Sequence, residues 1–157
     1  MNDTETREIM SKFINEHSFA VLSTINSEGH PHGTAIYAAS DANLNVYFKT
    51  KSGTAKTSYV DNDDMVAMTF GDEAAQATLQ LSGSAAEVYD SDEGDAALEL
   101  LENLKHHSDD ARPPISKLNA GNYLIFRITP DWARLRIYGG GTMVEGVQTY
   151  EYARGVQ

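Results

Sequence analysis

The spacing of apolar residues changes from a helical to a strand period early in the chain. Over residues 5–16, apolar side chains recur on one face at helical spacing, which predicts an amphipathic helix within an N-terminal segment, residues 1–17. Farther on, apolar and polar side chains alternate, which predicts strands over 19–25, 31–39 and 44–49. Turn residues separate these strands, so we expect an antiparallel meander.

The rest of the chain alternates between helical and strand patterns. A short helix is expected over 52–60 and a long amphipathic helix over 91–107. Gly83 interrupts a strand pattern and predicts a bulge or bend there. Residues 139–157, which begin with a run of three glycines, are expected to form a polar C-terminal tail, free or packed on a partner. The remaining strands are expected over 65–70, 76–89, 123–129 and 132–138.

Seven short strands joined mostly by tight turns favour an antiparallel barrel over a parallel sheet. The expected fold class is therefore mainly β, with helices flanking an antiparallel barrel. The chain has 157 residues, which is the size of a single domain. Its composition, 41% hydrophobic and 22% charged, is that of an ordinary globular protein and excludes a disordered or fibrous chain.

Several classes of protein are excluded by what the sequence lacks. There is no cysteine, so disulfides, thiolate catalysis and cysteine-ligated metal sites are excluded. No apolar run approaches the ~20 residues of a membrane helix, and the N-terminus lacks the apolar core of a secretory signal. We therefore expect a cytoplasmic protein with no membrane partner. The net charge of -11 argues against a nucleic-acid partner, because non-specific binding relies on Lys and Arg neutralising phosphates.

Positive charge is concentrated in one stretch of this acidic chain. Residues 42–60 contain Lys49, Lys51 and Lys56 and no acidic residue, whereas residues 61–111 contain fourteen acids and one base. A block of like charge is commonly a solvated face, and that interpretation stays open. The functional interpretation is a local anion site, which a phosphorylated small molecule needs where the protein as a whole repels it.

The residue types around these lysines suit a phosphate. The chain is expected to leave a strand and start a helix at Ser52, where free backbone N–H groups and a partial positive charge attract anions. Thr54 adds a hydroxyl donor and Lys56 a charge, while Gly53 allows the backbone to come close. An ordinary strand–turn–helix capped by Ser52 explains the serine, but not three lysines without an acid.

Three sequence motifs resemble those of the pyridoxamine 5'-phosphate oxidase-like, FMN-binding split-barrel superfamily. They are FAVLSTINSEGHPH at residues 19–32, VYFKTKSGTAK at residues 46–56 and ITPDWARL at residues 128–135. Their order and spacing are more specific than any one of them, and together they extend over most of the chain. The resemblance implies an antiparallel split β-barrel, and the short chain looks most like the general-stress-protein-type branch.

The resemblance also implies an FMN site at the interface of a homodimer, in a flavin-dependent oxidoreductase acting on a small molecule. A deazaflavin is the alternative cofactor on the same fold. The residues expected to hold the phosphate are Thr50, Ser52, Thr54 and Lys56, with Lys49 and Lys51 adding positive potential. The residues expected at the flavin ring or ribityl chain are Thr34, Thr78 and Gln80, with Trp132 and Arg134 from the other subunit. The simpler interpretation of Thr78, Gln80, Trp132 and Arg134 is a polar edge that faces solvent.

Three places depart from the pattern of the oxidase itself. Its close relatives carry arginine where this chain has Thr34 and Ala55, and Arg-Leu-His-Asp-Arg where residues 134–138 read Arg-Leu-Arg-Ile-Tyr. True pyridoxamine 5'-phosphate oxidase activity is therefore not expected. The alternative function is a non-catalytic ligand-binding or stress-related module on the same barrel, with weak or lost flavin binding.

The sequence gives little indication of a metal site or of catalytic side chains. His30 and His32 share a face of the expected second strand, but no third ligand accompanies them, so we expect surface histidines and no metal site. No nucleophile–base pair or carboxylate dyad stands out, and no catalytic residue is assigned. A flavoprotein does not need one, because the cofactor carries the redox chemistry.

Overall fold

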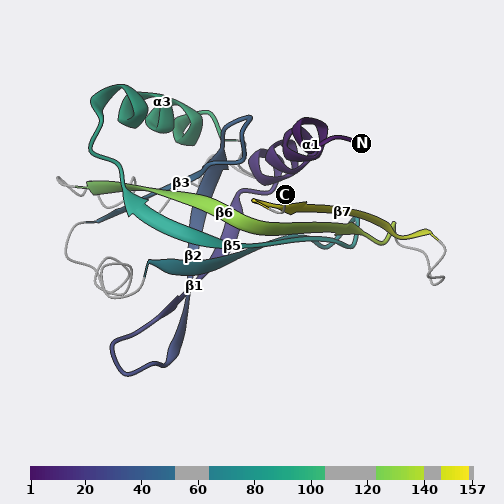
Figure 1. Cartoon of the computed structure of the whole chain (residues 1–157), viewed down its shortest axis with the longest axis horizontal. Coiled ribbons are helices and arrows are strands. Elements are labelled where there is room, and N and C mark those ends of the chain that lie inside the picture. Colours follow the sequence, from purple (N-terminus) through teal and green to yellow (C-terminus); the bar gives the residue numbers. More distant parts are fainter. Residues whose placement is uncertain (52–63, 105–122, 140–145, 156–157) are drawn as a thin grey trace.

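The structure is a computed structural model that describes residues 1–51, 64–104, 123–139 and 146–155 (Figure 1). Its elements are α1 (Asp3–Glu16), β1 (Phe19–Ile25), β2 (Pro31–Ser40), β3 (Val46–Lys51), β4 (Met65–Asp72), β5 (Ala77–Glu87), α3 (Ser91–Glu102), β6 (Tyr123–Ile137) and β7 (Gln148–Ala153). The helix expected over 52–60 lies outside the described residues. The helix expected over 91–107 is shorter than predicted, since α3 ends at Glu102 with Asn103 as its C-cap.

Six antiparallel strands form a closed barrel. The strand order is β3-β2-β1-β4-β5-β6-β7, and an additional pairing of β3 with β6 closes the ring. The long strand β6 makes this possible, because its first half pairs with β3 and its second half pairs with β7. The prediction of a mainly β fold built on an antiparallel barrel is confirmed.

The core fills the inside of the barrel, and α1 contributes to it. Alternate side chains on each strand point inward, so that Leu22, Phe48, Met68 and Leu79 are fully buried in one cluster. Met10, Phe13 and Ile14 of α1 belong to the same cluster. The helix begins at Asp3 because Asn2 and Glu5 form a capping box, each side chain accepting from the other's backbone N–H.

The second helix, α3, covers part of the outside of the barrel. Its N-cap is Asp90, whose side chain accepts a hydrogen bond from the Glu93 backbone. Ala97 packs against the outward-facing Tyr47 of β3 and Ile125 of β6. In Figure 1 both helices of the described residues, α1 and α3, lie on the same side of the long strands β5 and β6.

A bulge joins two segments that were expected to be separate strands. The segments 123–129 and 132–138 form the single strand β6, and its pairing with β5 shifts register between Ser82 and Gly83. The predicted irregularity at Gly83 is confirmed. A Cβ atom at Gly83 would lie 2.1 Å from the Thr129 carbonyl oxygen, so only glycine lets the two backbones come this close.

The prediction of a polar tail over residues 139–157 is wrong for part of that segment. Gln148–Ala153 form β7, which pairs with β6 from Trp132 to Ile137. Tyr150 and Tyr152 pack against the barrel core, and the strand satisfies backbone groups along an edge of β6. The pattern was missed because its alternation is aromatic against polar over only six residues.

Among the described residues, no helix combines the length and the apolar composition that crossing a membrane requires.

Candidate functional site

Three of the predicted phosphate-site residues lie at the end of β3. Lys51 is exposed, while Lys49 is partly buried with its Nζ 5.4 Å from the ring centroid of Tyr123. Thr50 is 3% exposed and lies on the opposite side of the strand from these lysines. Both lysines therefore face the outside of the barrel at the start of β6, whereas Thr50 faces inward. The other members of the predicted set, Ser52, Thr54 and Lys56, lie outside the described residues.

Four other predicted residues meet on the outer face of β5 and β6. The register places Gln80 directly opposite Arg134, and Ser82 directly opposite Trp132. Thr78 lies one pair along from Gln80, opposite Arg136. Side chains two residues apart on a strand share a face, so the set forms one polar patch. We call Thr78, Gln80, Trp132 and Arg134 the β5–β6 patch.

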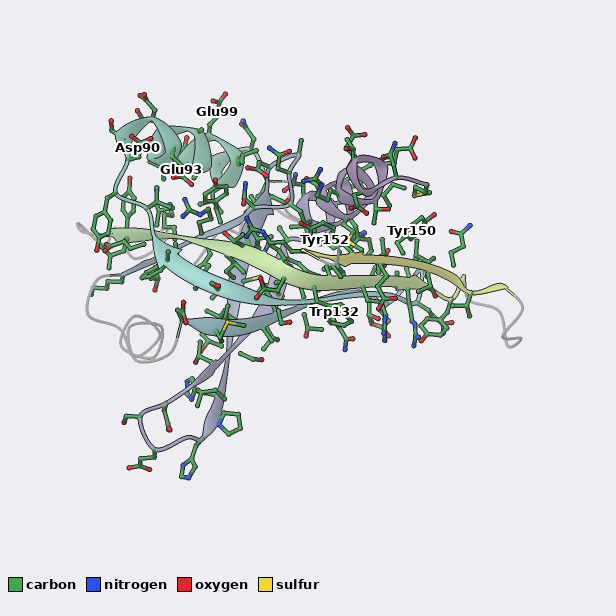
Figure 2. All side chains as sticks on the ribbon, viewed as in Figure 1. Asp90, Glu93, Glu99, Trp132, Tyr150 and Tyr152 are labelled. Carbon is green, nitrogen blue, oxygen red and sulfur yellow. The ribbon has the colours of Figure 1, made fainter. Side chains whose placement is uncertain are left out.

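A carboxylate of β7 binds two members of this patch. Glu151 lies opposite Arg134 in the β6–β7 register. Its Oε1 accepts a hydrogen bond of 3.1 Å from Trp132 Nε1 and one of 3.0 Å from Arg134 Nη2. The Arg134 guanidinium also lies over the Trp132 ring, 5.1 Å from its centroid. Figure 2 shows Trp132 on the side of the β6–β7 ribbon opposite Tyr150 and Tyr152.

The electrostatics of this cluster follow from these contacts. The hydrogen bond from Trp132, and after it the one from Arg134, hold the pKa of Glu151 below its usual range. The Arg134 Nε is shielded from solvent and, within the described part of the chain, has no hydrogen-bond acceptor. Sequence reasoning missed Glu151 because it did not expect β7; the spacing of Tyr150 and Tyr152 was the available signal.

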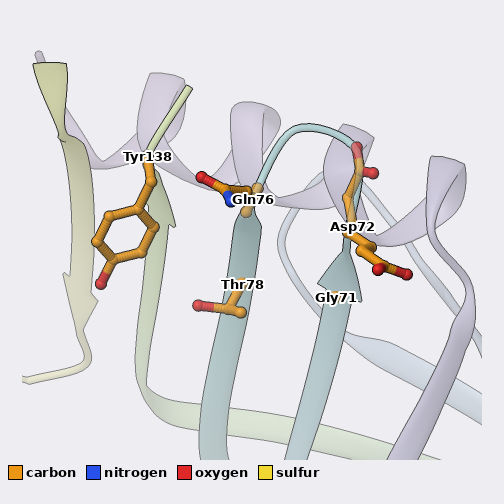
Figure 3. A pocket seen from close by; sticks show the side chains of 7 residues that line it. Gly71, Asp72, Gln76, Thr78 and Tyr138 are labelled. Carbon is orange, nitrogen blue, oxygen red and sulfur yellow. The ribbon is translucent and has the colours of Figure 1, made fainter. Parts of the chain in front are cut away.

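A pocket opens beside Thr78 at the turn between β4 and β5 (Figure 3). Its volume is ≈ 620 Å³, and it is open to solvent. The turn is held by Asp72, whose Oδ1 accepts from the backbone N–H groups of Ala74 and Ala75. The residues that line the pocket are Gly71, Asp72, Glu73, Gln76, Ala77, Thr78 and Tyr138. The β5–β6 patch therefore ends in a hollow large enough for part of a small molecule.

The same outer face carries an apolar patch on the neighbouring strands. Phe19 and Val21 of β1 are 60% and 45% exposed, and Met65 of β4 is 45% exposed. Val21 pairs with Thr69 of β4, which pairs with Gln80 of β5, so this apolar patch borders the β5–β6 patch. We call Phe19, Val21, Ile25 and Met65 the β1–β4 patch.

Thr34, the remaining predicted flavin contact, does not share this outer face, because it pairs with the fully buried Leu22 and so lies on the inward-facing side of β2. It pairs with Leu22 of β1, one residue from Ala35, which is opposite Val21. Beyond this point β1 pairs with β4 only as far as Ser23, so the tip of the β1–β2 hairpin extends away from the barrel (Figure 1). Thr34 is thus separated from Gln80 by the strands β1 and β4 and lies on the other side of the sheet, so the structure does not bring it to the β5–β6 patch.

The two histidines considered as metal ligands lie on this hairpin. His30 precedes β2, with its Nδ1 3.6 Å from Glu28, and His32 is the second residue of β2. In the described ranges there is no group of three or more His, Cys, Asp or Glu side chains placed to hold a metal ion.

One further polar cluster fastens α3 to the barrel. The Tyr47 hydroxyl donates a 3.0 Å hydrogen bond to Glu93, and Arg127 forms an ion pair with the same carboxylate oxygen. Burial, and then the hydrogen bond to Glu93, raise the pKa of the Tyr47 hydroxyl well above its usual range. The cluster lies between α3, β3 and β6, away from the β5–β6 patch, and its contacts are structural.

The sequence profile of the family described as pyridoxamine 5'-phosphate oxidase matches residues 6–137, which is most of the chain. The chain belongs to this family. The sequence-based resemblance is thereby confirmed, and the barrel is that of a pyridoxamine 5'-phosphate oxidase-like protein. The matched region ends at the last residue of β6, so β7 and Glu151 lie beyond it. No match was found among proteins of curated function.

Solved structures share the fold at low sequence identity. A pyridoxamine 5'-phosphate oxidase-related, FMN-binding protein of Nostoc punctiforme is 14% identical, with a TM-score of 0.70, and 100% of this chain and 95% of that one are covered. General Stress Protein 26 of Bacillus anthracis is 19% identical, with a TM-score of 0.62 and coverage of 86% and 94%. A heme-binding protein of Mycobacterium smegmatis is 15% identical, with a TM-score of 0.66, and only 57% of its length is covered. These similarities establish the fold.

Proposed function

We propose that this family member is an FMN-binding flavoprotein that acts as a flavin-dependent oxidoreductase on a small molecule. The observation that carries the proposal is the β5–β6 patch, where hydroxyl, amide and guanidinium donors from two strands share one face with the Trp132 ring beside an open pocket. A flavin ring presents carbonyl and ring-nitrogen acceptors along its edge, and these donors match them. When bound, FMN would supply the electron and hydride transfer.

The residues present fit such a cofactor in their donor chemistry. The shielded Nε of Arg134 is a donor without an acceptor in the described part of the chain, and a ligand acceptor would satisfy it. Lys49 and Lys51 face outward at the end of β3 and supply positive charge for a phosphate. The hydroxyl of Thr50 points inward, so its part in the phosphate site rests on the sequence prediction.

We propose further that the protein works as a homodimer. The β5–β6 patch and the end of β3 lie at opposite ends of β6, beside Arg134 and Tyr123 respectively. One FMN could use both regions if each came from a different subunit. The β1–β4 patch supports this arrangement, because exposed apolar side chains clustered beside a polar site favour burial by a partner.

The direct test is a flavin titration of the purified protein. We expect about one FMN per chain, seen as flavin absorbance that remains with the protein after gel filtration. Lys56→Ala should weaken FMN binding by ~1.5–3 kcal/mol, the scale of a hydrogen bond to a charged group. Lys12→Ala is the matched control, because Lys12 is an exposed lysine of α1. If the two variants bind FMN with equal affinity, the phosphate does not bind at the segment that contains Lys56.

The second candidate is a non-catalytic ligand-binding module on the same barrel. The observation that favours it is Thr34, which stands where close relatives of the oxidase carry arginine. This alternative would be supported if the purified protein is colourless and binds neither added FMN nor an added deazaflavin. Its cytoplasmic location stays a prediction under either function.

A further inference from the structure

We propose that Glu151 determines the charge specificity of the β5–β6 patch: by occupying Arg134, it prevents the site from gripping an anionic group, so the site takes an uncharged small molecule there. The inference rests on the proposal that small molecules bind at this patch. It adds a residue of β7, which lies outside the region shared with the family profile.

The geometry of guanidinium recognition carries the argument. Arginine grips carboxylate or phosphate with two parallel N–H groups, either Nε with Nη2 or Nη1 with Nη2. Both pairs require Nη2. In this protein Arg134 Nη2 donates to Glu151 Oε1 at 3.0 Å. This bond takes one of the two N–H groups of Nη2, and Nε is shielded from solvent, so at most the Nη1–Nη2 side is left for an anion. An anion bound there would lie beside the Glu151 carboxylate, which repels it and already neutralises Arg134.

The same carboxylate oxygen also positions the neighbouring indole. Trp132 Nε1 donates to Glu151 Oε1 at 3.1 Å, so one oxygen ties the two side chains together. Arg134 lies over the Trp132 ring, which leaves a compact unit of indole, guanidinium and carboxylate with little net charge. Glu151 is therefore a positioning residue as well as a counterion.

An anionic ligand would have to displace, or lie beside, a counterion that the protein holds in place. The direct register pairing of Arg134 with Glu151 means that no rearrangement of the backbone is needed to keep the ion pair. Arg136 is exposed on the same face of β6, opposite Thr149. It can attract anions to the surface, and for this reason the test must separate Arg134 from Arg136.

The test compares two ligands that differ in charge but hardly in shape, 4-nitrobenzoate and 4-nitrobenzamide. Trp132 is the sole tryptophan of the chain, so quenching of tryptophan fluorescence reports binding at this patch without any flavin. We expect the parent to bind the amide at least as tightly as the acid. Glu151→Ala should strengthen binding of the acid about tenfold and change binding of the amide less than about twofold.

Two further variants make the result specific. Glu151→Ala combined with Arg134→Ala should lose the gain for the acid, because Arg136 alone is left. Glu151→Gln keeps an acceptor for Trp132 and removes the charge, and it serves if the alanine variant disturbs β7; it should shift selectivity towards the acid in the same direction. Glu102→Ala, at an exposed carboxylate of α3, is the matched control and should behave as the parent.

The outcomes separate this inference from the proposed function. Equal changes for acid and amide, or no change in either folded Glu151 variant, would overturn the role of Glu151 even if FMN binds. If the Glu151 variants bind 4-nitrobenzoate selectively more tightly but the protein binds no FMN in the titration, the role of Glu151 is supported and the proposed flavin binding is refuted. The inference would also be overturned if the double variant, Glu151→Ala with Arg134→Ala, still bound 4-nitrobenzoate more tightly than the parent.

Discussion

Gly83 of β5 lies opposite Pro130 of β6, and the two backbones touch at this point. A Cβ atom built on Gly83 would lie 2.7 Å from Pro130 Cα and 2.1 Å from the Thr129 carbonyl oxygen. This contact marks the register shift at which β6 passes from its β3-paired half to its β7-paired half. The two halves of β6 can therefore pair with the same strand β5 because glycine stands at this one position.

Replacing this glycine should destabilise the barrel. Gly83→Ala forces the rigid backbone of Thr129 and Pro130 to move, and we expect the free energy of unfolding to fall by ~1–3 kcal/mol. Urea denaturation followed by circular dichroism measures this change. Gly94→Ala is the control, because a Cβ there meets nothing within 4 Å inside helix α3. That variant should gain about 0.5–1 kcal/mol from helix propensity, and equal stability of the two variants would refute the close contact.

The Tyr47–Glu93 bond should appear in the stability of the protein at high pH. The pKa of Tyr47 is raised above 10.0 in the folded chain, so the unfolded chain loses this proton first as pH rises. The contribution of the raised pKa is complete below pH 10 and is lost progressively above it. Tyr47→Phe should lower stability at pH 7, by ~1–2 kcal/mol, and show a smaller further loss between pH 9 and 11. Parallel pH profiles for parent and variant would contradict this assignment.

Protonation of Glu151 should change the emission of Trp132 at acid pH. Because its pKa is lowered, the carboxylate and its hydrogen bonds persist below the usual range of a glutamate, and they are lost only as pH falls further. We expect a shift in tryptophan fluorescence with a midpoint below that of an ordinary glutamate. Glu151→Gln should remove the transition, provided that circular dichroism shows both proteins to be folded over the same range. An unaltered transition in the variant would assign it to another group.

The β1–β4 patch should control association of two chains. Val21→Glu places a charge within the exposed apolar patch, which would have to be desolvated on burial by a partner. We expect the parent to sediment as a dimer and the variant as a monomer at micromolar concentration. Tyr89→Glu is the control, because Tyr89 is 86% exposed and lies outside this patch. Monomeric parent protein, or a Val21→Glu dimer of parental stability, would refute this interface.

The strand pattern determined much of the fold, and the physical reason is local. Inward residues such as Leu22 and Leu79 must be apolar, and outward residues such as Gln80 need not be, so a period of two is visible in the sequence. Gly83 could be predicted as an irregularity for a similarly local reason, since glycine inside a strand weakens it unless a close approach requires it. Family motifs then identified the barrel.

The site was predictable only in part. Thr78, Gln80, Trp132 and Arg134 were expected to contact one ligand, and the structure brings them together through the β5–β6 register, which no local pattern encodes. Glu151 could not be connected with Arg134 from sequence, because the residues are 17 positions apart and their contact depends on β7 pairing with β6. The sequence by itself thus determined where the strands lie, because each strand must bury one side and its apolar residues therefore recur at every second position. The tertiary structure alone decided which strand edges pair, because β3 and β7 each pair with β6 only in the closed barrel. The contact between Glu151 and Arg134 follows from that pairing.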